Sequence, residues 1–232
     1  MTHRFLAIPL LALMLQSAMM RSRAADGDLP VPRGLSTCAA DGASASGMDR
    51  MVSALGGVSL GCFQSGETTE LRGSKKTYAV PLEYAFAVEL KGGPHAAKDV
   101  DQLMSDVTDG WKGVKPLNQD TRADYERRLD GLIEKAPPSG TPNPAKWVNP
   151  PVLVSIEPLD PGSFAVVAIR QRQVPLNGEF FNTTKVDAAA VVLRHAKLVR
   201  LSIARELRTK ADVETAREEV ADWAYAVASR RE

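Results

Sequence analysis

Residues 185–205, KVDAAAVVLRHAKLVRLSIAR, decide the fold of this 232-residue chain. The stretch contains two apolar runs rich in Val, Leu and Ile, and the short segment 194–197 joins them. Two such runs with a tight connection predict a β-hairpin, with strands over 185–194 and 198–205.

The sequence on either side extends this hairpin into a sheet with a helix on it. Upstream, residues 152–156 and 164–174 are predicted strands, separated by the turn sequence Asp160-Pro161-Gly162. Downstream, Thr209 and Asp212 resemble a capping box. The apolar face of the helix that follows consists of Val213, Ala216, Val220, Trp223, Ala224 and Val227. These elements predict an α+β fold in which an antiparallel β-sheet is covered by helices, including a long C-terminal amphipathic helix.

The first half of the chain carries weaker signals. Alternating residues predict a strand over 78–90. Apolar residues spaced three and four apart predict helices over 99–111 and 121–135, and a short helix over 47–55. Residues 64–76 are polar, and we predict a loop there.

The C-terminal pattern resembles that of small exported bacterial proteins with a PsbP-like α/β/α sandwich. The resemblance rests on the hairpin Asp187–Arg205, on Trp223 in the sequence Ala-Asp-Trp-Ala, and on a helix after an early strand. It covers about residues 75–230. It implies an α/β/α sandwich and a binding or assembly role without catalysis.

The N-terminus reads as a secretory signal. Arg4 precedes a largely apolar run, and Ser22 and Ala24 occupy the small-x-small positions before Ala25. We therefore predict a signal peptide over 1–24, a flexible arm over 25–46 rich in Ala, Gly, Asp, Ser and Pro, and a single α+β domain over 47–232. The predicted location is periplasmic or secreted, and the alternative is an uncleaved N-terminal anchor.

Cys38 and Cys62 are the two cysteines of the chain. In an oxidising compartment an isolated pair of cysteines is most simply a disulfide. The alternative is a redox or metal pair, but C-x-x-C spacing is absent and no histidine lies nearby in the sequence. We predict a structural disulfide.

The charge balance argues against a nucleic-acid partner. Removing residues 1–24 takes away three of the 29 basic residues and none of the 28 acidic ones, so the predicted mature chain carries about −2. Nucleic-acid binding needs a basic footprint. No span of the predicted mature chain is apolar enough to cross a membrane.

Two features are candidate binding sites. Arg170 and Arg172 alternate onto one face of a predicted strand, and Arg200 does so on another. Neighbouring strands would gather these groups into a cationic patch for a carboxylate or phosphate. The alternatives are that these arginines lie on the solvent face of a half-exposed sheet, or that they pair with Glu157 and Glu179. Trp147, in the proline-rich segment 137–151, is a candidate contact residue or a plug at the edge of the core.

No catalytic, metal or cofactor motif stands out. The sequences G-x-S-x-G, G-x-G-x-x-G and H-E-x-x-H are absent, and we predict no cofactor. The leading hypothesis is a binding module that recognises another protein or an envelope component, such as an immunity-type inhibitor or an assembly factor. The alternatives are an envelope hydrolase with dispersed carboxylates and a carrier of a small apolar ligand.

Overall fold

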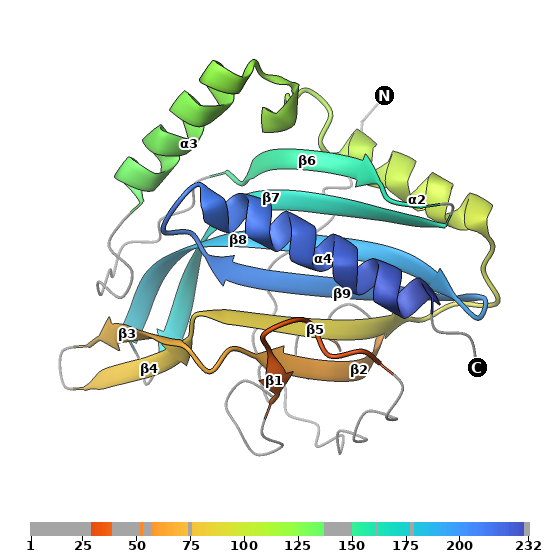
Figure 1. Ribbon diagram of the computed structural model, residues 1–232, viewed down its shortest axis with the longest axis horizontal. Helices are drawn as coiled ribbons and strands as arrows, with labels where there is room; N and C mark the ends of the chain where they lie inside the picture. Colours follow the sequence, from red (N-terminus) through yellow and green to blue (C-terminus); the bar gives the residue numbers. More distant parts are fainter. Residues whose placement is uncertain are drawn as a thin grey trace, which may run out of the picture.

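A seven-stranded antiparallel sheet forms the centre of the fold (Figure 1). The structure, a computed structural model, describes residues 29–38, 52, 57–73, 76–136, 150–160, 162–176 and 179–229. The strands lie in the order β1-β2-β5-β9-β8-β7-β6. Their bounds are β1 Ser36–Thr37, β2 Gly57–Gln64, β5 Glu83–Leu90, β6 Val152–Pro158, β7 Ser163–Leu176, β8 Glu179–Arg194 and β9 Lys197–Glu206.

The hairpin predicted from residues 185–205 is the β8–β9 pair at the middle of the sheet. Arg194 pairs with Lys197, so His195 and Ala196 make a two-residue turn. Both have positive φ, 49° and 58°, which is the backbone of a type I′ turn and suits the twist of the strands. Strand β8 begins at Glu179, six residues before its predicted start, because it pairs with β7 as far as Leu176.

Helices lie on both faces of the sheet (Figure 1). Helix α4 (Ala211–Ser229) buries its predicted apolar face against inward residues such as Val167, Ala188 and Leu201. Helix α2 (Ala97–Gly110) packs on the opposite face, on Phe164 and Val191. The α+β fold and the α/β/α layering are therefore as predicted, whereas the PsbP-like resemblance stays a prediction.

Helix α3 (Arg122–Lys135) lies next to α4. Its Leu129 is fully buried, and the hydroxyl of Tyr125 donates to Glu214 of α4 at 2.8 Å. The short 3₁₀ helix η1 (Leu117–Gln119) leads into it and contacts β6. Thr121 caps α3 by accepting a hydrogen bond from the backbone N–H of Asp124.

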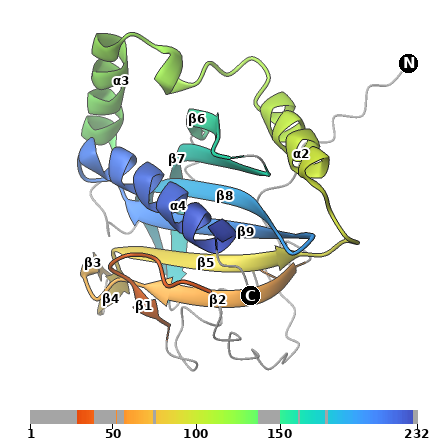
Figure 2. The same cartoon turned by 45° about the vertical axis from the view of Figure 1, so that its right-hand side comes forward.

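The N-terminal half differs from prediction. Strands β3 (Thr68–Arg72) and β4 (Thr77–Pro81) form a separate hairpin at one end of the sheet (Figure 2). Residues 64–76 were expected to be a loop because only Leu71 and Thr69 of β3 are buried, which leaves little apolar signal. The strand predicted over 78–90 is two strands, because the chain leaves the hairpin at Leu82 and enters β5.

The described part of the predicted arm lies against the domain. Trp223 donates its indole N–H to the carbonyl oxygen of Pro30 at 2.7 Å, and Leu29 and Leu35 pack against the core. Strand β1 pairs with β2. Residues 29–38 of the predicted flexible arm 25–46 therefore have partners in the domain, through their apolar side chains and the Pro30 carbonyl, and the flexible arm itself stays a prediction.

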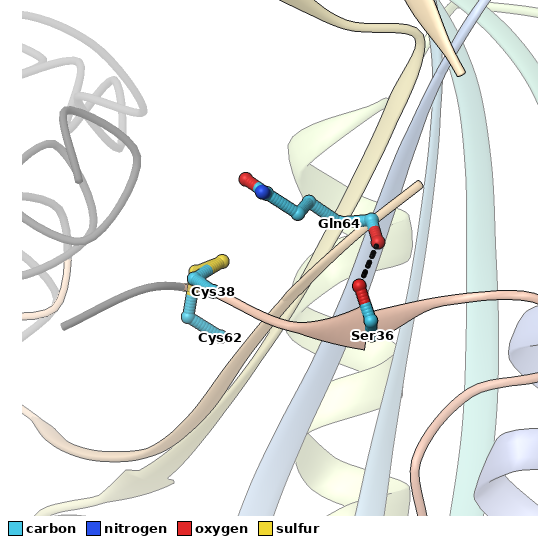
Figure 3. The surroundings of a disulfide bond; sticks show 4 residues. All are labelled: Ser36, Cys38, Cys62 and Gln64. Atoms are coloured by element: carbon cyan, nitrogen blue, oxygen red, sulfur yellow. Dashed lines mark hydrogen bonds between the residues drawn. A yellow bond between two sulfur atoms is a disulfide. The ribbon is translucent and has the colours of Figure 1, made fainter. Parts of the chain in front are cut away.

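Cys38 and Cys62 form the predicted disulfide (Figure 3). Their Cα atoms lie 5.4 Å apart. The backbone N–H of Cys38 donates to the carbonyl oxygen of Cys62 at 2.9 Å. The hydroxyl of Ser36 donates to the backbone carbonyl oxygen of Gln64 at 3.3 Å. The bridge thus fastens the β1 segment to β2, and it is consistent with an oxidising compartment.

The predicted signal peptide, most of the predicted helix 47–55 and Trp147 lie outside the described residues. In the part of the chain that the structure describes, no helix has the length and hydropathy needed to cross a membrane.

Candidate functional site

The candidate site lies on the sheet face turned away from α4. Strand alternation puts Arg170 and Arg172 of β7 on this face, together with Lys185 and Asp187 of β8 and Arg200 of β9. The opposite residues of the same strands, such as Ile169 and Val186, point into the core under α4. We call these five side chains, Arg170, Arg172, Lys185, Asp187 and Arg200, the arginine cluster.

The carboxylate of Asp187 is the centre of the arginine cluster. A terminal nitrogen of Arg172 donates to its Oδ2 at 2.5 Å, and Nε of Arg170 lies 3.4 Å from the same oxygen. The other carboxylate oxygen, Oδ1, is buried and has no hydrogen-bond partner in the described structure. One carboxylate therefore serves two guanidinium groups and is only partly satisfied itself.

Two further cations border this pair: Lys185, which stands opposite the buried Glu206 of β9, and Arg200, which stands opposite Val191 of β8 and Val88 of β5. Lys185 is buried, and its ammonium group donates to the carbonyl of Leu82 at 3.1 Å. Arg200 donates from Nε to the hydroxyl of Ser202 at 3.2 Å. Across the residues that the structure describes, neither side chain has an ion pair within 4.0 Å. The cluster thus holds four cations around one ion-paired carboxylate.

Burial and mutual repulsion act on these cations together. Burial lowers the pKa of Arg200, and the nearby charge of Arg170 lowers it further. Burial also lowers the pKa of Arg170, which Asp187 offsets only in part. The pKa of Lys185 falls to about 8 through burial, against the opposing effect of Glu206. The pKa of Arg172 is raised instead: burial acts to lower it, but Tyr84 and Asp187 outweigh that effect. On balance, burial therefore disfavours the charge of three of the four cations, and a nearby anion would favour it.

The residues on either side of Asp187 in this face have short side chains. Asp187 pairs with Ala168 on one side and Ala204 on the other, and Tyr84 of β5 follows Ala204 in the same row. Because Ala204 is short, Arg172 reaches across to the hydroxyl of Tyr84 at 3.1 Å. Ala189, at the centre of the sheet, stays partly exposed. The arginine cluster therefore has short side chains beside it, and Arg172 stays partly exposed.

This arrangement suits an anionic group. Guanidinium groups bind carboxylate and phosphate through paired N–H donors. The buried Nε atoms of Arg170 and Arg172 have no aligned acceptor in the described structure. Arg172 keeps about a third of its side chain exposed, so the cluster is reachable from solvent.

A second polar cluster lies on the other side of the sheet, beneath α4. Arg205 of β9 pairs with Glu83 of β5 and with Glu219 of α4, and Asp212 lies 4.0 Å away. Burial raises the pKa of Glu83 to about 7, and the charge of Glu219 adds to this effect. These carboxylates converge on a guanidinium, so they tie α4 to the sheet.

Two cavities lie elsewhere. One of about 320 Å³ lies between α2 and the β6–β7 turn, and one of about 190 Å³ lies between α3 and strands β6–β8. Neither is lined by the carboxylates of the second cluster. Among the described residues, no group of three or more His, Cys, Asp or Glu side chains is placed to hold a metal ion.

No family model matches the sequence. No curated protein matches it either. Among solved structures, the Saccharomyces cerevisiae Ran-binding protein Mog1p and a point mutant of protein Mog1 are similar to this chain. Each is 14% identical, the alignment covers 85% of this chain and 81% of the other, and the TM-score is 0.30. Similarity of this degree carries no inference about function.

The structure brings together the three arginines singled out from the sequence. Arg170 and Arg172 lie on β7 and Arg200 on β9, two strands away, with β8 between them. The expected partner Glu157 instead pairs with Arg217 of α4 at 3.0 Å. That pairing was wrong because the sequence does not reveal strand order, and β8 supplies the carboxylate.

Sequence reasoning missed Asp187, Lys185 and Tyr84. Asp187 had a detectable signal, since it is a lone acid in the apolar strand KVDAAAVVL. A charged residue at such a position is rarely buried unless it is paired.

Proposed function

We propose that this protein is an exported, non-catalytic binding module that recognises an acidic group of another protein through the arginine cluster. The observation that carries the proposal is the excess of cations near Asp187: Arg170 and Arg172 share its carboxylate, and Lys185 and Arg200 have no ion pair in the described structure. An acidic side chain or chain terminus of a partner would supply the missing negative charge.

The net charge of the chain favours a local contact over broad electrostatic attraction. The predicted mature chain carries about −2, so no overall positive charge adds to that of the cluster. Nucleic acids and anionic lipid surfaces attract extended basic patches. A localised group of arginines suits a single acidic group on a protein.

Export is part of the proposal. The leader predicted over 1–24 and the Cys38–Cys62 disulfide both fit a periplasmic or secreted location. An immunity-type inhibitor and an envelope assembly factor are concrete forms of such a module.

The test is affinity capture with the predicted mature chain, residues 25–232, from extract of its own organism, read by mass spectrometry. Arg200→Gln is the informative variant, because Arg200 has no ion pair in the described structure and its loss leaves no carboxylate unpaired. Arg122→Gln is the matched control, since this exposed arginine of α3 pairs with the exposed Glu126.

We expect one protein to be captured at near-stoichiometric yield by the wild type and by Arg122→Gln, and at least about tenfold more weakly by Arg200→Gln. Equal capture by all three chains would reject the arginine cluster as the contact. Recovery of the folded wild type alone would reject a protein partner.

A further inference from the structure

The larger of the two cavities, of about 320 Å³, lies between helix α2 and the turn that joins β6 to β7. Phe164, at the start of β7, belongs to its wall. Phe164 and Arg170 are six residues apart on this strand, which corresponds to about 20 Å. The cavity is therefore a separate site, and it can bind a ligand whether or not the arginine cluster does.

Most of the wall of the cavity is apolar. Val100 and Met104 are one helical turn apart on α2 and pack in the same cluster as Phe164. Pro158 and Leu159, at the end of β6, complete the apolar part. Five of the eight lining residues are thus apolar, as is usual for a site that takes a small molecule.

Two carboxylates also line the cavity, one from each side. Asp101 follows Val100 on α2, and Asp160 lies in the β6–β7 turn. Ser163 holds this turn: its backbone N–H donates to the carbonyl oxygen of Asp160 at 2.9 Å, and its hydroxyl accepts from the Asp160 N–H at 3.2 Å. These bonds fix the backbone of Asp160 and do not use its carboxylate.

Both carboxylates are open to a ligand. Asp101 and Asp160 are exposed residues. Within the described part of the chain, neither carboxylate has an ion pair within 4.0 Å or a side-chain hydrogen bond. None of the lining residues is basic. The cavity therefore combines an apolar wall with two negative charges, and a cation would complement them.

The wall and the charges together define the ligand. An organic cation suits the cavity better than a metal ion, because its apolar part can contact the wall. A primary ammonium group has three N–H donors, so it can bind one carboxylate or both. An engineered apolar cavity of about 150 Å³ holds benzene, and this cavity of about 320 Å³ has room for a ring with a short chain.

We propose that this cavity binds a small organic ammonium ion. Its apolar body lies against Val100, Met104 and Phe164, and its ammonium group lies at Asp101 and Asp160.

The probe is benzylamine, which carries a positive charge at pH 7 as alkyl ammonium groups do. Benzyl alcohol has the same ring and methylene group without the charge, and methylamine has the charge without the ring. Binding to the predicted mature chain, residues 25–232, is followed by protein-detected NMR shifts during titration. We expect benzylamine to saturate the shifts of Val100 and Met104, and each control to bind at least about fivefold more weakly.

Asp101→Asn and Asp160→Asn each remove one charge and nearly keep the shape of the side chain. We expect each to weaken benzylamine binding about threefold to fivefold and to leave benzyl alcohol binding unchanged. Asp109→Asn is the matched control, because Asp109 is exposed on the same helix, about 12 Å farther along, and does not line the cavity. It should bind benzylamine as the wild type does.

Nα-acetyl-lysine methylamide tests the other source of such a cation, a lysine side chain of a protein. We expect it to bind more weakly than benzylamine, because its flexible stem loses more conformational freedom. Tighter binding of the lysine compound would overturn the proposal in favour of a protein ligand.

The proposal is also overturned if benzylamine causes no saturable shifts at concentrations up to about 10 mM. Two further results would do the same: benzyl alcohol binding as tightly as benzylamine, and Asp109→Asn losing as much affinity as Asp101→Asn.

Discussion

Glu83 and Arg205 stand directly opposite each other on β5 and β9, and the guanidinium of Arg205 lies against the Glu83 carboxylate. The same guanidinium also binds Glu219 of α4 at 2.9 Å. One cation therefore holds two carboxylates at the point where the last helix meets the sheet. Since Glu83 is only 4% exposed, its ionisation is linked to the stability of the fold.

The Glu83 carboxyl should make stability depend on pH in the opposite direction from an ordinary paired acid. Its folded pKa is raised to about 7 from 4.5, by burial and then by Glu219. The folded state therefore holds a proton that the unfolded state has lost between these pH values. This contribution is fully present below about pH 4.5 and is lost as the pH rises through about 7.

We expect Glu83→Gln to remove this dependence. The difference in unfolding free energy between wild type and Glu83→Gln should change by about 2–3 kcal/mol between pH 5 and pH 8, with the wild type losing relative stability as the pH rises. Urea unfolding at the two pH values measures it. The exposed Glu126→Gln serves as the control, and a wild type that tracks Glu83→Gln at both pH values would contradict the prediction.

The disulfide should stabilise the fold through the β1 segment. Cys38 and Cys62 are 24 residues apart, and a bridge across a loop of that size contributes about 3 kcal/mol on the chain-entropy model. We expect the Cys38→Ser/Cys62→Ser double variant to lose about that much in urea unfolding. Reductant should destabilise the wild type equally and leave the variant unaffected. Equal stability of wild type and variant would show that the bridge constrains nothing.

Trp223 should hold residues 29–38 on the domain. Its indole N–H donates to Pro30, and its ring makes an edge-to-face contact with Phe63 at 5.6 Å between centroids. Trp223→Phe leaves the Pro30 carbonyl unpaired, and we expect a loss of about 2 kcal/mol.

Tyr225→Phe is the matched control, since this exposed hydroxyl makes a longer hydrogen bond to Leu159 at 3.3 Å. It should cost less than about 0.5 kcal/mol. Similar losses in the two variants, measured by urea unfolding, would contradict a specific role for the Pro30 contact.

The C-terminal half of the fold was predictable because its signals are local. Strands β6 to β9 and helix α4 are long enough for alternation and helical spacing to stand out from the sequence. Strand β2 was not predicted, because Gly57 and Gly61 look like breaks. Gly57 instead allows close packing: a Cβ there would lie 2.2 Å from a methyl carbon of Val88 and 2.7 Å from the carbonyl oxygen of Glu89.

The candidate site was predictable only in part. Alternation along one strand placed Arg170 and Arg172 together, which needs no knowledge of neighbouring strands. Their partner Asp187 and the nearby Tyr84 come from β8 and β5, and strand order is a property of the whole sheet. The Glu83–Arg205–Glu219 cluster was not predicted either, because its members come from two strands and a helix whose arrangement the sequence does not reveal.

Asp187 provides the last prediction, which joins stability to the proposed binding role. Asp187→Asn leaves Arg170 and Arg172 without their shared carboxylate on a largely buried face, and we expect a loss of about 2–4 kcal/mol. Arg200→Gln should be neutral or stabilising, because it removes a cation whose pKa is lowered by burial and by Arg170.

Phosphate should then distinguish an anion site from a structural ion pair. With Asp187 neutralised, an added anion can take the place of its carboxylate, so about 20 mM phosphate should recover more stability in Asp187→Asn than in the wild type, beyond the general effect of the salt. The double variant Asp187→Asn/Arg200→Gln should recover less, because one of the cations is gone. Equal recovery in all three chains would mean that the arginines pair with Asp187 only to stabilise the sheet and do not bind added anions.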